Sequence, residues 1–471
     1  MADQLVPRDE IEAALQGHAA DYAEIRMDDT ATNRLVYRGR ELEEIGRTLS
    51  FGGNARALVN GGWGFVSFND PAGLRERVAE AVSQARSASG GGGERSRLAE
   101  VAPVTDIVPL YVRRDPRAIP LARKKELLDG YNDLMLSTAG VTSTNIVYSD
   151  AHKRVVFASS EGSYIEQERI DVVSRLAATA RKNGDMQQSS MSLGALGDFT
   201  YIEEMEETAR GLGRRAVELL SASYVKAGTY PVVLDPVLAG VFCHEAFGHL
   251  SESDHVYENE RMKEIMVLGR RFGQPHLNIA DGAAVPGLRG SYRYDDEGVP
   301  ARKTDLIRDG ILVGRLHSRE TAGKMGEPLS GNARALDYRF PPIVRMTNTY
   351  IEPGTLDFEE LIADIKEGVY ARNWFGGTTS MEMFTFSAGE AYMIRDGKIA
   401  ELLRPPKLTG NLFSTLLNID ALGNDMEVPS GDGEPRGWNQ GGGCGKMGQM
   451  PLPVSNGSPH IRIQDCVVGE R

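Results

Sequence analysis

Long apolar runs are missing from this chain of 471 residues. A helix that crosses a bilayer needs roughly 20 consecutive apolar residues, and no segment of the sequence approaches that requirement. The first residues, Met1 to Asp9, contain neither the basic region nor the apolar region of a secretion signal. We therefore expect a cytoplasmic protein with no membrane partner.

Acidic residues outnumber basic ones, and cysteines are scarce. The chain has 53 Lys and Arg against 66 Asp and Glu, a formal net charge of −13. Nucleic-acid binding requires clustered Lys and Arg, so we expect no nucleic-acid partner. The three cysteines, Cys243, Cys444 and Cys466, are too few for a disulfide framework. A lone cysteine in a special setting within a reducing compartment indicates metal binding or catalysis.

Hydrophobic periodicity predicts an α+β chain of two domains, since the length exceeds what one core usually serves. Strands are expected at 22–28, 35–37, 63–68 and 144–192, and helices at 70–89, 120–136 and 205–223. The pattern resets to a new strand at 230–234, so we place an N-terminal α/β domain with an antiparallel sheet at 1–226. A strand-rich C-terminal domain at 227–471 carries the histidine helix and two Asp-Gly hairpins, at 309–310 and 396–397.

The run from Asp235 to His255 contains His244-Glu-Ala-Phe-Gly-His249 on a helix that Asp235-Pro236 is expected to cap. A carboxylate directly after a histidine ligand is where zinc enzymes hold a general base. The common zinc-peptidase helix places its histidines at i and i+4. Five residues correspond to ~140° around a regular helix, so these two share a metal only if the turn is widened. We expect the irregularity near Gly248, because glycine tolerates unusual backbone.

Alternatives remain open on this pattern alone. In one alternative, the two histidines have unrelated roles, one as a surface residue and one as a core residue. If they do bind a metal, the candidates for a third ligand are Cys243, Glu252, Asp254, His255 and Cys444. Cys444 is favoured because it lies among glycines, where a cysteine has no apolar neighbours to pack against. A His/His/Cys set with one open position suits Zn²⁺.

These motifs together resemble the TldD/PmbA family of zinc metalloproteases, specifically the catalytic TldD-like subunit. The resemblance includes His244 to His249, the glycine-rich loop around Cys444, Trp374-Phe-Gly-Gly-Thr378 and Leu408-Thr-Gly-Asn411, and it extends over essentially the whole chain. It implies that His244, His249 and Cys444 bind Zn²⁺ and that Glu245 is the catalytic base. It also implies hydrolysis of unfolded peptides or polypeptides inside a chamber enclosed by a dimer.

The resemblance implies a partner as well. A metal-less TldE/PmbA-like paralogue is the favoured second subunit, and a homodimer is the alternative. Other functions remain to be separated from peptide hydrolysis. One is a regulatory binding protein of the gyrase-modulator type, with a structural zinc site closed by Glu252, Asp254 or His255. Another is a metal-free hydrolase that uses Cys444 with a histidine, which sensitivity to chelators would exclude.

Overall fold

The computed structural model describes residues 6–90, 94–380, 382–430 and 435–470. Its N-terminal half is built on a seven-stranded sheet in the order β3-β2-β1-β5-β6-β4, with β7 also paired to β6. The strands are β1 (Tyr22–Arg38), β2 (Glu41–Val59), β3 (Gly62–Phe68), β4 (Thr105–Val108), β5 (Val141–Ser159), β6 (Tyr164–Lys182) and β7 (Asp185–Leu196). β4 runs parallel to β6, whereas the other neighbours pair in antiparallel fashion.

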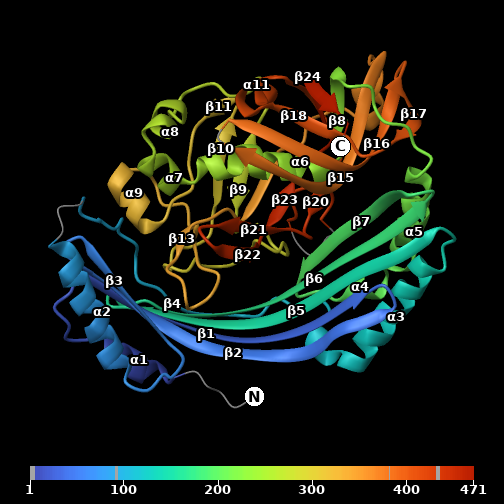
Figure 1. The fold of residues 1–471 in the computed structure, drawn as a ribbon. Coiled ribbons are helices and arrows are strands. Elements are labelled where there is room, and N and C mark those ends of the chain that lie inside the picture. Colours follow the sequence, from blue (N-terminus) through green and yellow to red (C-terminus); the bar gives the residue numbers. More distant parts are fainter. Residues whose placement is uncertain (1–5, 91–93, 381, 431–434, 471) are drawn as a thin grey trace.

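This sheet is curved, and its concave face is turned toward the C-terminal half of the chain (Figure 1). Helices pack at both of its ends. They are α1 (Arg8–Leu15) and α2 (Leu74–Ser89) at one end, and α3 (Leu121–Leu136), α4 (Thr200–Glu203) and α5 (Glu206–Leu219) at the other, with a 3₁₀ turn at Pro116–Ala118. Each end has its own apolar core between helices and sheet.

The strands of this sheet are longer than the short ones expected from the sequence. β1 continues without a break through 22–38, and no strand was expected over most of β2. The cause lies in the burial: β2 is largely exposed from Glu41 to Ser50 and buried from Gly52 onward. Where both faces of a strand meet solvent, the alternation of apolar and polar residues disappears, and periodicity no longer reveals the strand.

The C-terminal half contains two larger sheets. One has the order β15-β8-β24-β18-β16-β17, and β15 also pairs with β16, so that five of its strands close into a ring. Its strands are β8 (Gly228–Leu234), β15 (Glu367–Ser380), β16 (Met383–Arg395), β17 (Lys398–Leu403), β18 (Lys407–Asn411), β19 (Ile419–Leu422) and β24 (Ile461–Gly469). The other follows the order β11-β10-β9-β14-β23-β20, and two-stranded ribbons join β12 to β13 and β21 to β22.

The remaining C-terminal elements are short. The strands are β9 (Ile279–Gly282), β10 (Lys303–Arg308), β11 (Ile311–Leu312), β12 (Ala333–Arg334), β13 (Ile343–Val344), β14 (Asn348–Ile351), β20 (Trp438–Asn439), β21 (Gly443–Lys446), β22 (Gln449–Pro453) and β23 (Ser455–Gly457). The helices are α6 (Pro236–Cys243), α7 (Ser253–Glu258), α8 (Glu260–Ile265), α9 (Arg319–Met325), α10 (Phe358–Ile362) and α11 (Leu412–Leu417). Both Asp-Gly hairpins are confirmed: Asp309-Gly310 joins β10 to β11, and Asp396-Gly397 joins β16 to β17.

Helix α6 lies between the two larger sheets, in contact with β8 and β15 of one and with β14, β20 and β23 of the other. Its six residues from Leu238 to Cys243 are all buried, as expected for a helix covered on every side. The predicted cap is confirmed: Pro236 occupies the first turn, and the Asp235 carboxylate accepts from the Leu238 N–H at 2.8 Å. This cap fixes where the histidine segment begins.

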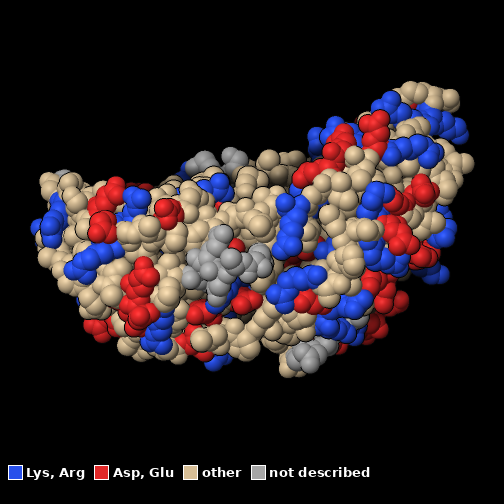
Figure 2. Space-filling view, turned by 90° about the horizontal axis from the view of Figure 1, so that it is seen from below, with Lys and Arg blue, Asp and Glu red and all other residues tan. Residues whose placement is uncertain are grey.

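The predicted α+β fold class is confirmed, with an antiparallel N-terminal sheet and a strand-rich C-terminal half that carries the histidine helix. The division at 226/227 stays a prediction and falls between α5 and β8. Within the described ranges, every helix is too short or too polar for a bilayer crossing. Basic and acidic side chains are interspersed over the face seen in Figure 2.

Candidate metal centre

The histidine segment leaves α-helical geometry at the predicted place. His244 to Gly248 form a single π turn between α6 and a 3₁₀ turn at His249–Ser251. The backbone N–H of His249 donates to the carbonyl of His244, the i to i+5 bond that defines a π turn. The wider turn brings residues five apart toward the same side of the axis. The predicted irregularity is therefore confirmed.

The reason given for Gly248 was wrong. Its backbone angles, φ −57° and ψ −52°, are ordinary helical values that any residue adopts. Glycine is needed there for space instead, because a Cβ would overlap the Sδ of Met346, a fully buried side chain. The π turn thus packs directly against the buried residue behind it, and this packing holds the turn in place.

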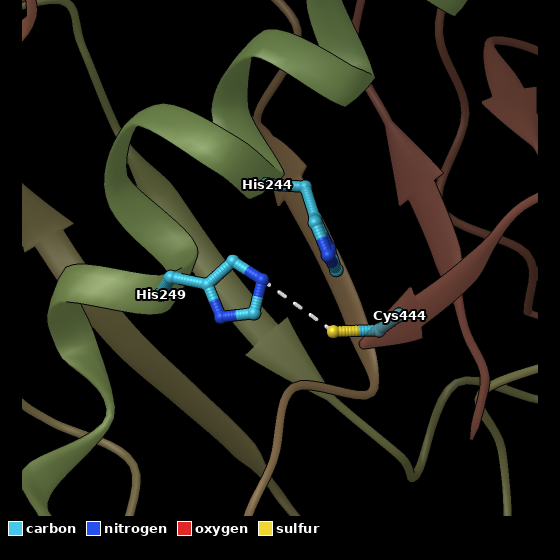
Figure 3. Close-up of side chains that lie close together, drawn as sticks. All are labelled: His244, His249 and Cys444. Carbon is cyan, nitrogen blue, oxygen red and sulfur yellow. Dashed lines mark hydrogen bonds between the residues drawn. The ribbon is translucent and has the colours of Figure 1, made fainter. Parts of the chain in front are cut away.

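The structure brings His244, His249 and Cys444 together (Figure 3). One possible ligand atom from each of the three lies within 4.8 Å of the others. The two imidazole centroids are 5.1 Å apart, and His249 Nε2 lies 3.5 Å from Cys444 Sγ. His244 and Cys444 are each 3 % exposed. The elements that supply them are far apart in sequence, since Cys444 comes from β21.

The electrostatics suit a metal cation. Burial disfavours the Cys444 thiolate, but the neighbouring His244 and His249 lower the pKa of this thiol to about 5. Nδ1 of His244 is buried and has no hydrogen-bond partner among the described residues. A buried imidazole nitrogen without a partner, beside a thiol of lowered pKa, is able to bind a metal cation. Two nitrogens and one thiolate form a donor set that fits Zn²⁺.

Glu252 and Lys446 support this group from behind. The Glu252 carboxylate, 1 % exposed, lies 3.0 Å from Nδ1 of His249 and 3.1 Å from Nζ of Lys446. Burial opposes ionisation, but His249 and then Lys446 lower the pKa of Glu252 to about 2. A carboxylate on Nδ1 fixes the tautomer and orientation of a ligand histidine and leaves Nε2 for the metal. Lys446 also binds Asp254 at 2.6 Å.

The suggested closing ligands Glu252, Asp254 and His255 lie outside the group of three donors. Glu252 contacts His249 and Lys446, Asp254 contacts Lys446, and His255 is exposed on α7. Cys243 is buried among apolar residues of the C-terminal core, and burial raises the pKa of its thiol. Burial likewise raises the pKa of Cys466, to about 12. Within the described chain three candidate donors gather, so a tetrahedral metal held by them would have one position left for a reactant.

Glu245 lies beside His244 in a cavity of about 210 Å³. It is half-buried, and its carboxylate has no hydrogen-bond or ion-pair partner among the described residues. The cavity walls come from both halves of the chain: Arg175, Ser190 and Ser192 of the N-terminal sheet face Asn373, Trp374, Phe375 and residues 441–443. An unpaired carboxylate in a polar cavity next to the three donors is suitably placed to move protons.

Two supporting residues were not foreseen from the sequence. Asn373 donates its backbone N–H to Asp235 at 3.0 Å and its side-chain amide to the carbonyl of Ser190 at 2.7 Å, so it ties the α6 cap to β7. Arg345 is fully buried and donates to the carbonyl of Cys444 at 2.9 Å. Neither residue had a signal in the sequence, because each contact joins segments that are far apart in the chain.

Comparison with known proteins places the chain in a family. Models of the PmbA/TldA metallopeptidase match domain 1 at residues 23–89, the central domain at 114–224 and the C-terminal domain at 227–470. Metalloprotease slr0863 of Synechocystis sp. is 48 % identical over 96 % of this chain and 95 % of its own length. The zinc metalloprotease TldD homolog of Saccharolobus solfataricus is 30 % identical over 96 % of this chain and 97 % of its own length.

Solved structures agree in fold. A Thermotoga maritima protein described as a modulator of a DNA gyrase has a TM-score of 0.77 at 20 % identity, covering 98 % of this chain and 99 % of that one. TldE from Thermococcus kodakarensis has a TM-score of 0.72 at 17 % identity, covering 98 % of each chain. With family models along most of its length and close metalloprotease relatives, this chain belongs to the PmbA/TldD family and is a metallopeptidase.

Proposed function

We propose that this chain is a zinc-dependent peptidase in which His244, His249 and Cys444 hold the metal and Glu245 is the general base. The observation that carries the proposal is the convergence of the three donors within 4.8 Å, directly beside the cavity that contains Glu245. Zn²⁺, when bound, polarises the scissile carbonyl and makes water more acidic. Glu245 then accepts the proton of the attacking water and returns it to the leaving amine.

The surrounding walls favour an extended peptide. β8 pairs with β15 only over 369–371, and β15 continues as Asn373, Trp374 and Phe375 along the cavity. The glycines of 441–443 line the same cavity; Gly441 packs against the backbone of Ser192, and Gly442 leaves space beside it. A peptide that adds to a strand in such a groove is recognised through its main chain, with little preference for side chains. The proposed substrates are therefore unfolded peptides and polypeptides.

Glu245→Gln tests the mechanism. We expect this variant to keep the fold and about one zinc per chain but to hydrolyse a flexible peptide at least about a hundredfold more slowly. Glu260→Gln is the matched control, because Glu260 has an 86 % exposed side chain on α8. Unchanged turnover in Glu245→Gln would remove Glu245 from the mechanism. Loss of zinc together with activity would make Glu245 a ligand or a support of one.

The proposed assembly is a dimer that encloses the zinc, with a metal-less paralogue preferred over a second copy as the partner. Enclosure would restrict access to chains that can thread inward and so protect folded neighbours. Sizing of the chain alone and mixed with the paralogue tests the assembly, beside assays on a flexible peptide and a compact protein. A monomer that cleaves both substrates equally would contradict this part of the proposal.

A further inference from the structure

A second and larger cavity lies between the two halves of the chain. Its volume is about 730 Å³, within the usual range for small-molecule and peptide sites. One wall is the N-terminal sheet, with residues of β1, β5 and β6, and the other is formed by segments 283–287, 291–296, 334–336 and 451–453. Much of the wall is apolar, including Val155, Leu196, Leu336 and Leu452. The site described above does not use this cavity.

Three guanidinium groups lie beside this cavity, and two of them contact the same carboxylate, that of Asp171. We call Arg169, Arg289 and Arg334 the arginine cluster. Arg289 donates to both oxygens of Asp171, at 2.9 and 2.8 Å. Arg169 approaches the same carboxylate only to 3.6 Å and donates to the carbonyl of Arg289 at 2.6 Å.

Arg334 has no carboxylate partner among the described residues. It is 4 % exposed and donates to the carbonyls of Met346 and Pro453, at 2.6 and 2.7 Å. Asp296, the next acidic group, lies 3.4 Å from Arg26. Arg26 and Lys153 also line the cavity, and they lie 3.1 and 2.9 Å from Asp28; the exposed Arg293 is a further cation of the wall. Four acidic side chains, Glu168, Asp171, Asp295 and Asp296, line the cavity as well. Of these, only Asp171 lies within ion-pair distance of Arg169, and none lies that close to Arg334.

Unbalanced buried charge is unfavourable, and an anion relieves it. Burial, partly offset by Asp171, lowers the pKa of Arg169 to about 10, and both Arg334 and Arg289 act in the same direction as burial. Burial also lowers the pKa of Arg334. The side chain of Arg169 is 21 % exposed and lines the cavity, whereas its Nε is buried and has no hydrogen-bond partner among the described residues. Arg169 is thus the group positioned to receive a ligand oxygen.

We propose that this cavity binds the C-terminal carboxylate of a peptide, with Arg169 as the anchoring cation and the apolar wall around the adjacent side chain. The inference rests on the proposed peptidase function and adds a recognition site distant in sequence from the zinc ligands. A terminal carboxylate beside an apolar side chain matches a cation beside an apolar wall.

The cavity is connected to the metal centre through one hairpin. Leu452 and Pro453 of β22 line the cavity, and Leu452 is the ladder partner of Cys444 on β21. From the arginine cluster, Arg289 donates to the carbonyls of Gln440 and Gly442, the latter at 2.7 Å, in the loop that leads to Cys444. A carboxylate bound at Arg169 would therefore lie next to the hydrogen bonds by which Arg289 holds the loop before Cys444.

The test compares two fluorescent eight-residue peptides that differ only in a C-terminal carboxylate or carboxamide and end in leucine. Binding is measured on zinc-loaded Glu245→Gln protein to prevent turnover, and hydrolysis is measured separately on the natural chain. We expect the carboxylate peptide to bind at least about tenfold more tightly, the effect of one charge-assisted hydrogen bond. Arg169→Gln should abolish the preference and leave the carboxamide peptide unaffected.

Arg181→Gln is the matched control, because Arg181 is exposed near the end of the same strand, β6, and lines neither cavity. Arg169→Gln should fold, since it removes a cation repelled by two others. If it does not, the comparison of the two peptides on the unmodified site still decides. Equal affinity for both peptides would overturn the proposal, as would a preference that survives Arg169→Gln.

Competition by octanoate distinguishes a peptide ligand from a small carboxylic acid. Displacement of the carboxylate peptide by octanoate supports the shared site. Octanoate binding that depends on Arg169, with no preference between the peptides, would overturn the peptide assignment. The two proposals can be contradicted separately. If the chain hydrolyses no peptide but still binds the carboxylate peptide more tightly through Arg169, only the proposed peptidase function is contradicted. If it hydrolyses peptides but binds both equally, only the proposed carboxylate site is contradicted.

Discussion

Gly248→Ala probes the packing that holds the π turn. The new Cβ would overlap Sδ of Met346 and lie 3.3 Å from its Cε, and Met346 is completely buried. Overpacking of this kind costs about 1–3 kcal/mol. Replacing glycine by alanine in a helix gains at most about 1 kcal/mol, so the overlap should decide the sign. We expect a net destabilisation of about 1–2 kcal/mol.

That free energy should divide between two measurements. If the turn keeps its position, the overlap with Met346 destabilises the folded state and lowers the denaturant midpoint. If the turn moves to relieve the overlap, His249 is displaced and metal binding is weakened. A shift of about 1.4 kcal/mol corresponds to about a tenfold loss of zinc affinity. Urea unfolding and competition with a chromophoric chelator measure the two parts. Zinc affinity should be determined on protein shown to be folded.

Gly211→Ala is the control, because Gly211 lies in α5 and a Cβ there meets nothing within 4 Å. It should be neutral or stabilising by up to about 1 kcal/mol. Met346→Ala should cost less stability in the Gly248→Ala background than in the natural chain, with a coupling of about 0.5–3 kcal/mol between the two sites. Gly248→Ala as stable and as metal-competent as the Gly211→Ala control would refute the packing argument.

Three further predictions concern the metal centre. Cys444→Ala should remain folded and lose most of its zinc, whereas the control Cys466→Ala should keep about one zinc ion per chain. Full zinc occupancy in folded Cys444→Ala would exclude Cys444 as a ligand. Glu252→Gln should weaken zinc binding about 10–100-fold with the fold intact, and Glu258→Gln, exposed on α7, should not change it. Burial opposes the charged form of His249, but Glu252 raises its pKa well above the usual value, whereas that of Cys444 is about 5. Zinc binding at pH 7 should therefore release about one proton, from His249, and zinc affinity should increase as the pH is raised. Calorimetry in buffers of different ionisation enthalpy measures the number of protons released. Release of no proton would contradict the assignment of His249 as a protonated ligand.

Local chemistry was predictable from the sequence. The Asp235-Pro236 cap depends on two adjacent residues, and the Asp-Gly hairpins depend on a turn type that needs positive φ. The irregular helix was inferred by counting five residues against the helical period. The gathering of Cys444 with His244 and His249 was anticipated, and the structure places the three together. The reason given for it, that a cysteine among glycines has no packing role, was wrong, because Cys444 is part of the buried C-terminal apolar core.

Features that depend on the tertiary environment were not predictable. The long exposed half of β2 has no apolar alternation to reveal it. The reason for Gly248 lies in Met346, a residue almost a hundred positions away, so the local backbone argument missed it. The contact of Glu252 with Lys446 likewise joins two elements that only the fold brings together. Pairings across the chain carry no signal in a single sequence.

The π turn has the form of a one-residue insertion. Without the extra residue, His244 and the second histidine would be four apart, and ~400° of rotation would leave them ~40° from each other on a regular helix. The wider turn absorbs that residue between the histidines, so the spacing from His249 to Glu252 is untouched and the contact of Glu252 with Lys446 is retained. The chain thus accommodates a change in length inside its metal motif without altering the register of the helical residues beyond His249.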